Sequence, residues 1–295
     1  MVVHSVLPDS LAAAVDDELR AARVAHVPHT GEAPLRAAEA AAADGDAAAL
    51  IGPFRSADVS EAVEATAPAG LALIAPVATW AGVTRDDEPG CDDAARHRGT
   101  VLRMVARDTE VAARIAADVR AAGHRALVVA GGHEYGVQLD GQLRLAGLPR
   151  AQDPADADVV VLCGLAGGPE IDRATALAPL PVVAFDGAQG ADLGAGRDVT
   201  VALPVAPADG VVVGDVMFFV EPARRAARLV AAALAGGARD RARVLSAMRA
   251  AGPFDEHGDP VDPPVWLWRA ADDWSLTPDR PLSGGPSFRV SGQGR

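Results

Sequence analysis

Lysine and asparagine are absent from this chain of 295 residues, and all 27 basic residues are therefore arginine. Without lysine the chain cannot form a Schiff base, anchor pyridoxal phosphate or supply the lysine of a P-loop. Without asparagine it has no N-glycosylation site. The absence of lysine thus excludes several classes of enzyme, and the absence of asparagine excludes one modification, before any pattern is considered.

Cysteine is scarce as well, because Cys91 and Cys163 are the only two. They are too few for a cysteine-rich zinc site and indicate no disulfide framework, although a single bridge between them stays open. His26 and His29 have a spacing that a metal site can use, but no third ligand accompanies them, and we interpret them as a surface pair. We interpret the acidic stretch 86–93 as a solvated loop rather than a cation site.

Positive charge is outweighed, since 40 acidic residues leave a net charge of −13 and a pI of about 4.9. Nucleic acid and anionic membrane surfaces are therefore not expected as partners, because both require a basic face. Hydrophobic residues make up 49% of the chain and charged residues 23%, which is typical of a globular protein. The length suits one large domain or two ordinary ones.

Long apolar runs are missing too, and no stretch approaches the ~18 apolar residues that a membrane span requires. The first arginine is Arg20, so the amino-terminal segment lacks the basic region and apolar core of a signal peptide. The sequence as it stands predicts a cytoplasmic protein, or an extracytoplasmic one if a leader was removed.

Neither Gly-x-Ser-x-Gly nor His-Glu-x-x-His occurs. No catalytic motif, metal site or cofactor is predicted.

Short apolar runs alternate with alanine-rich helical stretches along most of the chain, which predicts an α/β fold of parallel sheets covered by helices. We expect Ser10 to cap the first helix and Asp58 with Glu61 to form a capping box on the third. The predicted strands are 2–7, 24–27, 48–51, 71–75, 101–105, 126–130, 158–163, 182–185 and 266–269. The predicted helices are 10–23, 34–44, 58–67, 109–122, 137–145, 170–177, 216–234 and 239–251.

Four strings stand out against this pattern: Leu50–Ser56, Ala75–Thr79, Glu134–Gly136 and Gly252–Gly258. The first three each follow an apolar run, at the carboxyl end of a predicted strand, where open α/β sheets bind small ligands. In order and spacing the four strings resemble those of the type I periplasmic binding proteins, the branched-chain amino-acid binding family. The resemblance extends from about residue 2 to residue 274.

The resemblance implies two Rossmann-like lobes with parallel sheets, joined by a hinge of several crossings, with ligand closed between them. We expect crossings near 103–109 and 205–211. The implied lobe 1 comprises 1–106 and 207–251, the implied lobe 2 comprises 107–206 and 252–277, and a loose tail covers 278–295.

The resemblance also implies ligand contacts from two loops of lobe 1. Ser56 and Ala57 correspond to the residues that hold a ligand carboxylate at a helix N-terminus. The backbone of Val77 and Ala78 and the hydroxyl of Thr79 correspond to a second contact loop. Each has a structural alternative: Ser56 as a helix cap, and Thr79 as an ordinary turn residue after proline.

The residues that flank these loops also have two readings each. We expect Arg55 to pair with Asp58 on the surface rather than to contact ligand. Trp80 either forms an apolar wall of the site or packs against its own lobe.

In lobe 2 the resemblance implies that Tyr135, the only tyrosine, covers the ligand with its ring. Asp186 corresponds to the acidic residue that pairs the ligand ammonium, with a solvated turn as the alternative. The chain departs from the family where Gly167-Gly168 replaces a second aromatic wall. It also lacks the family's first-lobe cysteine pair, since Arg55 occupies one of those positions.

These features favour a ligand-binding protein that closes two lobes on a small polar, amino-acid-like molecule. The resemblance implies a role in an ABC importer with a permease as partner. If the protein has no leader, a cytoplasmic sensor that acts on a regulatory protein is expected instead. An enzyme on the same fold is the first alternative, with His133, Glu134 or Asp186 as the general base. A degenerate interaction module that binds no ligand is the second. His257 is interpreted as part of a structural turn.

Overall fold

The computed structural model describes residues 1–85, 99–188, 190–207, 219–273 and 275–282. These residues fall into two compact units, which we call lobe 1 and lobe 2. Of the described residues, lobe 1 contains those within 1–108, 204–264 and 275–277, and lobe 2 those within 109–203, 265–273 and 278–282.

The chain leaves lobe 1 after Asp108, returns after Leu203 and leaves again after Pro264. The first point lies inside the interval 103–109 and the second beside the interval 205–211, where the sequence placed crossings. Residues 252–264 belong to lobe 1, although the resemblance assigned them to lobe 2. The backbone shows why, because the carbonyl of Gly258 accepts a hydrogen bond from the Arg103 N–H at 2.8 Å.

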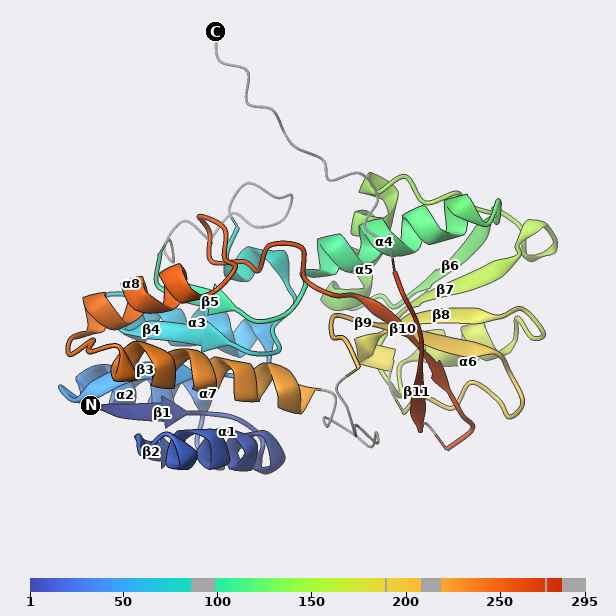
Figure 1. Cartoon of the computed structure of the whole chain (residues 1–295). Helices are drawn as coiled ribbons and strands as arrows, with labels where there is room; N and C mark the ends of the chain where they lie inside the picture. Colours follow the sequence, from blue (N-terminus) through green and yellow to red (C-terminus); the bar gives the residue numbers. More distant parts are fainter. Residues whose placement is uncertain (86–98, 189, 208–218, 274, 283–295) are drawn as a thin grey trace, which may run out of the picture. The chain divides into compact units, whose positions relative to one another are not determined.

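Lobe 1 is built on a five-stranded parallel sheet in the order β2-β1-β3-β4-β5 (Figure 1). A helix or helical turn follows each of the first four strands, as parallel pairing requires. The strands are β1 (Val2–Ser5), β2 (Ala25–Pro28), β3 (Ala47–Ile51), β4 (Ala72–Ala75) and β5 (Val101–Arg103).

Helices cover both faces of this sheet, and Figure 1 shows them as two groups. α2 packs on α3, whereas α7 packs on both α1 and α8. All five residues of β3 are buried, because a strand between two helical layers has no solvent-facing side. The helices are α1 (Asp9–Ala21), α2 (Pro34–Ala43), α3 (Ser56–Thr66), α7 (Val220–Ala235) and α8 (Arg241–Ala251), with a short 3₁₀ turn η1 (Ala81–Val83).

Lobe 2 contains a six-stranded sheet in the order β11-β10-β9-β8-β7-β6. Strands β6 to β9 are parallel, and β10 runs antiparallel to β9. The strands are β6 (Ala126–Ala130), β7 (Val159–Cys163), β8 (Val182–Phe185), β9 (Val199–Leu203), β10 (Trp266–Ala270) and β11 (Leu276–Pro281). The helices are α4 (Asp108–Ala121), α5 (Glu134–Leu145) and α6 (Pro169–Thr175), with 3₁₀ turns η3 (Pro154–Asp156) and η4 (Asp186–Ala188).

The prediction of an α/β fold with two mostly parallel sheets is confirmed, and the predicted strands and helices lie within a few residues of those observed. Three local predictions are wrong. Ser10 does not cap α1, because the helix begins at Asp9 and its N-cap position is Pro8. The capping box at Asp58 fails because α3 begins two residues earlier, at Ser56. The first residues of the expected loose tail, 278–281, belong to β11, and its remainder from 283 on lies outside the described residues.

Candidate functional site

The predicted contact residues of lobe 1 lie beyond the carboxyl ends of β3 and β4. Gly52 turns the chain out of β3 with a φ of 107°, and its N–H donates to the carbonyl of Ile74 at 2.8 Å. A Cβ at this position would lie 2.3 Å from the carbonyl oxygen of Val6, so the turn requires glycine. This turn leads the chain directly into α3, whose first residues are Ser56 and Ala57.

A hydrogen bond joins the two predicted contact loops of lobe 1. The Oγ of Ser56 accepts from the backbone N–H of Trp80 at 3.2 Å. Ser56 therefore does not act as the side-chain cap of α3, which was its structural alternative. It is half-buried and Ala57 is exposed, so the first turn of α3 is open to solvent beside the second loop. Arg55 is exposed and shows no ion pair with Asp58 among the described residues, so that predicted pair is wrong.

The second loop lies deeper in the lobe. Val77, Ala78 and Thr79 are buried, with 4%, 1% and 7% of their surface exposed. Trp80 packs against the hydrophobic core of its own lobe, and Gly82 leaves room for its ring, since a Cβ there would lie 2.4 Å from an indole carbon. The packing role of Trp80 is thus the observed one.

In lobe 2, Tyr135 and Asp186 are joined by a hydrogen bond. The Tyr135 hydroxyl donates to Oδ1 of Asp186 at 2.5 Å, and the N–H of Gly187 donates to the same oxygen at 2.9 Å. The two residues come from the starts of α5 and η4, which follow β6 and β8. Burial raises the pKa of Asp186, and these two hydrogen bonds only partly offset that effect.

Two further side chains extend this cluster. His133 is the N-cap of α5, and its Nδ1 accepts from the N–H of Gly136 at 3.1 Å. Its Nε2 therefore carries the proton and donates to Oε1 of Glu170 at 3.0 Å. The His133 ring lies parallel to that of Tyr135, with centroids 6.4 Å apart. Both ring nitrogens of His133 are thus occupied by structural hydrogen bonds.

Glu170 is the member of this cluster that sequence reasoning missed. It is fully buried at the start of α6, and its Oε1 also accepts from the N–H of Leu165 at 2.9 Å. Burial alone would raise the pKa of Glu170, but these hydrogen bonds hold it below its ordinary value. Glu134, by contrast, is exposed and accepts from Gln138, so only its neighbours belong to the cluster.

The histidines of the β1–β2 edge are not the surface pair that the sequence predicted. The side chains of His26 and His29 are only 3% and 8% exposed. A hydrogen bond of 2.9 Å joins Nε2 of His29 to Nδ1 of His4. The ring of His26 is instead hydrogen-bonded to Oγ of Ser5 at 2.8 Å and to Oδ1 of Asp16 at 3.1 Å. They therefore belong to two separate hydrogen-bond groups. Within the described residues, no cluster of three or more His, Cys, Asp or Glu has a metal-binding arrangement.

The acidic stretch 86–93, including Cys91, lies outside the described residues, so a disulfide between Cys91 and the buried Cys163 is not tested.

His257 lies in a turn as predicted, with its N–H donating to Oδ1 of Asp255 at 2.9 Å. None of the helices in the described part of the chain is long and apolar enough to span a bilayer.

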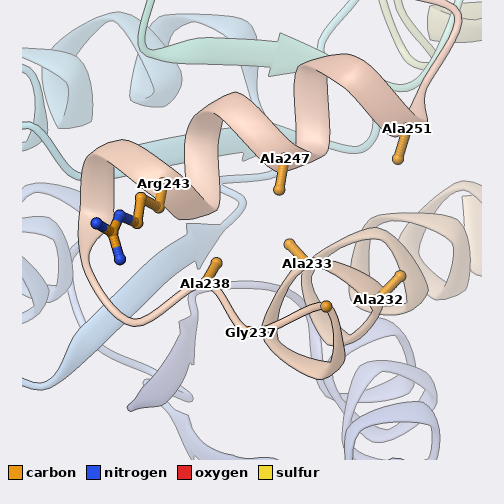
Figure 2. A pocket seen from close by; sticks show the side chains of 8 residues that line it. Ala232, Ala233, Gly237, Ala238, Arg243, Ala247 and Ala251 are labelled. Carbon is orange, nitrogen blue, oxygen red and sulfur yellow. The ribbon is translucent and has the colours of Figure 1, made fainter.

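Lobe 1 also has surface hollows elsewhere. One of them, with a volume of about 310 Å³, lies between α7 and α8. Figure 2 shows the residues that line it. Its lining is mostly alanine and glycine, and its one charged residue, Arg243, is exposed and paired with Asp240. Two others, of about 500 and 480 Å³, include Met1 at the amino end of the sheet. These hollows contain none of the predicted contact residues and bring no set of buried polar side chains together.

Comparison with known proteins identifies the fold. No protein-family model and no curated protein sequence matches the chain. Solved structures do match. An ABC transporter substrate-binding protein from Desulfitobacterium hafniense, also solved in complex with Leu, has a TM-score of 0.74 at 18% identity, over 94% of this chain and 99% of the other. This chain has the type I periplasmic binding protein fold.

Two further solute-binding proteins with this fold show the range of ligands among the matches. The branched-chain amino-acid binding protein LivJ from Streptococcus pneumoniae, in complex with isoleucine, has a TM-score of 0.68 at 15% identity, over 95% of this chain and 99% of the other. A solute-binding protein from R. palustris in complex with 4-hydroxybenzoate has a TM-score of 0.69 at 12% identity, over 99% and 100%. The type I fold is thus shared with proteins that bind amino acids and an aromatic acid.

Proposed function

We propose that this chain is a solute-binding protein for a small amino-acid-like molecule that carries both a carboxylate and an ammonium group. Lobe 1 supplies the open first turn of α3 and Thr79 for the carboxylate, and lobe 2 supplies Asp186 for the ammonium. Binding draws the two lobes together, because only the closed state lets the ligand contact both sets of residues.

The observation that carries the proposal is the Tyr135–Asp186 pair. It places a carboxylate and an aromatic ring at the carboxyl edge of the lobe 2 sheet, where open α/β folds bind ligands. The raised pKa of Asp186 indicates that its carboxylate lacks full compensation, which a ligand cation would provide. The ligands of the two amino-acid-bound neighbours carry the same ammonium group.

The alternative of an enzyme receives less support from the same cluster. His133 has no ring nitrogen available as a base, because Gly136 and Glu170 occupy both. Glu134 is exposed and hydrogen-bonded to Gln138. A role in transport with an ABC permease is supported only by the likeness to these neighbours and is part of this proposal. A cytoplasmic sensor is its alternative.

A thermal-shift screen tests the proposal with L-amino acids, their amides and the matching 2-oxo acids. We expect L-amino acids to raise the melting temperature most, since stabilisation reaches about 2.7 kcal/mol at a hundredfold excess over Kd. Amides lack the carboxylate and 2-oxo acids lack the ammonium, so both should give smaller shifts.

The variant Asp186→Asn should abolish the response to L-amino acids, because an amide cannot neutralise the ammonium. Asp172→Asn is the matched control, since Asp172 is exposed on α6 in the same lobe. Absence of any shift with all three compound classes, or an equal response in the Asp186→Asn variant, would overturn the proposal.

A further inference from the structure

A buried ion pair lies beneath the second contact loop of lobe 1. The Arg103 side chain at the end of β5 is fully buried, and the Asp259 side chain is 1% exposed. Nε of Arg103 donates to Oδ1 of Asp259 at 2.9 Å. A buried ion pair seldom adds net stability, because the cost of removing two charges from water offsets their attraction. The role of these two side chains is therefore indicated by the other hydrogen bonds that they make.

The other donors of Arg103 reach the contact loop itself. Nη1 donates to the carbonyl of Ala78 at 2.5 Å, and Nη2 donates to the carbonyl of Trp80 at 2.9 Å. The carbonyl between them, that of Thr79, accepts from the N–H of Asp108 at 2.8 Å. All three carbonyls of the loop 78–80 thus accept a hydrogen bond, and the planar guanidinium of Arg103 is the donor for two of them.

Asp259 completes this arrangement from the other side. Its Oδ1 also accepts from the hydroxyl of Thr84 at 2.6 Å, and its Oδ2 accepts from Nε of Arg85 at 2.9 Å. Burial alone would raise the pKa of Asp259, but Arg103, Arg107 and these hydrogen bonds lower it to about 2. Asp259 is therefore ionised at neutral pH and holds the carboxyl end of the segment 80–85, while Arg103 holds its amino end through the carbonyl of Trp80.

The string Gly252–Gly258, which no ligand contact explains, presents Asp259 in this position. Oδ1 of Asp255 accepts from the N–H of Asp259 at 3.0 Å and closes the turn. Gly258 has a φ of 91°, and a Cβ there would lie 2.1 Å from the carbonyl oxygen of Val101, so the segment lies directly against β5. No larger residue allows this approach.

We propose that Arg103 and Asp259 are positioning residues that preset the backbone of the loop 78–80 for ligand before ligand arrives. The inference rests on the proposed function, in which Thr79 contacts ligand. A preset loop lowers the conformational entropy lost on binding, and the ligand affinity gains accordingly. Neither side chain needs to touch ligand for this effect.

Three variants separate positioning from stability. Arg103→Met removes the network. Arg103→Lys keeps the charge opposite Asp259, but a single ammonium cannot reach both loop carbonyls and Asp259 in the geometry of the planar fork. Arg241→Met is the matched control, because Arg241 also holds lobe 1 carbonyls, those of Ala42, Asp44, Ala47 and Ala69, but at the amino end of the sheet.

The first readout is amide hydrogen exchange of the segment 77–84 without ligand, at a temperature where all variants are folded. We expect Arg103→Met and Arg103→Lys each to speed exchange in this segment about tenfold, since local opening is governed by such contacts. Arg241→Met should leave it unchanged. Unchanged exchange in both Arg103 variants, or an equal rise in the Arg241 variant, would overturn the positioning role.

The second readout is affinity, measured by calorimetry, for the L-amino acid that gives the largest thermal shift. We expect a loss of about tenfold in both Arg103 variants and none in the Arg241 variant, because preorganisation contributes to affinity. Wild-type affinity in the Arg103→Lys variant would overturn the inference while leaving the proposed function intact. Failure of the wild-type protein to bind would count against the function instead, and the exchange readout, which needs no ligand, would still decide the positioning role.

Discussion

At the scale of single residues, the cluster in lobe 2 shows how neighbouring side chains set one another's state. Oε1 of Glu170 accepts a hydrogen bond from Nε2 of His133, and Nδ1 of His133 accepts one from the N–H of Gly136. This fixes the tautomer and the plane of the His133 ring, which lies parallel to Tyr135. Tyr135 is in turn held by Asp186. The aromatic ring expected to contact ligand is therefore placed by residues on both sides.

Only part of this cluster could be predicted from the sequence. Tyr135 and Asp186 follow recognisable strands, and their correspondence to a known motif was visible. Glu170 carried no signal, because it lies 37 residues from His133 and reaches it through space left by glycines. A Cβ at Gly164 or Gly168 would lie 2.4 Å from an atom of the Glu170 side chain. Such fits depend on packing between distant segments rather than on local pattern.

His26 gives a prediction for the pH dependence of stability. Burial lowers the pKa of His26, and the hydrogen bond with Asp16 only partly opposes this. The unfolded chain therefore binds a proton near pH 6.5 while the folded one does not. Protonation of His26 therefore favours the unfolded chain. The folded state has its full stability from the neutral His26 above pH 6.5 and loses it as the pH falls below 6.5.

We therefore expect the urea midpoint of the wild-type protein to fall between pH 7.5 and pH 5.5, and to fall less in the His26→Gln variant. His124→Gln provides the control, because His124 is exposed. The same pH dependence in wild type and the His26→Gln variant would contradict the assignment.

At the scale of elements, the strands and helices that the sequence predicts correctly are those with a clear pattern of apolar residues. β3 and β4 are buried apolar runs, and the alanine-rich α2 fits closely against α3. β9 is also a buried apolar run, but it is missing from the predicted strands. β11 contains two prolines and two charged residues, a composition typical of an edge strand that local pattern does not separate from a loop.

Helix α5 allows an element-scale prediction with an internal control. Gly136 follows Tyr135, and a Cβ there would lie 2.7–2.9 Å from backbone atoms of Gly131 and Cys163. Gly136→Ala should therefore destabilise the protein by about 1–3 kcal/mol, because backbone cannot move aside. Gly141 lies on the same helix with nothing within 4 Å, so Gly141→Ala should stabilise it by about 0.5–1 kcal/mol.

Urea unfolding followed by circular dichroism measures both variants. Opposite signs support the close packing of α5 against β6 and β7. Two stabilising substitutions would show that the start of α5 is less tightly packed than the structure indicates.

At the scale of the whole molecule, alternating strands and helices predicted an α/β fold and the family resemblance implied two lobes, and the structure and its neighbours agree on the fold. Local pattern could not assign the segment 252–264 to lobe 1, because its place is set by the contact of Gly258 with β5 and of Asp259 with Arg103. The ligand is also beyond local pattern, since the fold serves both amino acids and 4-hydroxybenzoate.

The central claim is that both lobes bind one amino-acid-like ligand. Calorimetric titration of the L-amino acid with the largest thermal shift tests it most directly, in the wild-type protein and in Thr79→Val and Tyr135→Phe variants. We predict one site per chain and an affinity about tenfold weaker, or about 1.4 kcal/mol, in each variant. Thr79→Val loses the proposed hydroxyl contact with ligand, and Tyr135→Phe loses the hydrogen bond that holds Asp186 in place for the ammonium. No binding by the wild-type protein, or wild-type affinity in the variant of either lobe, would contradict the account.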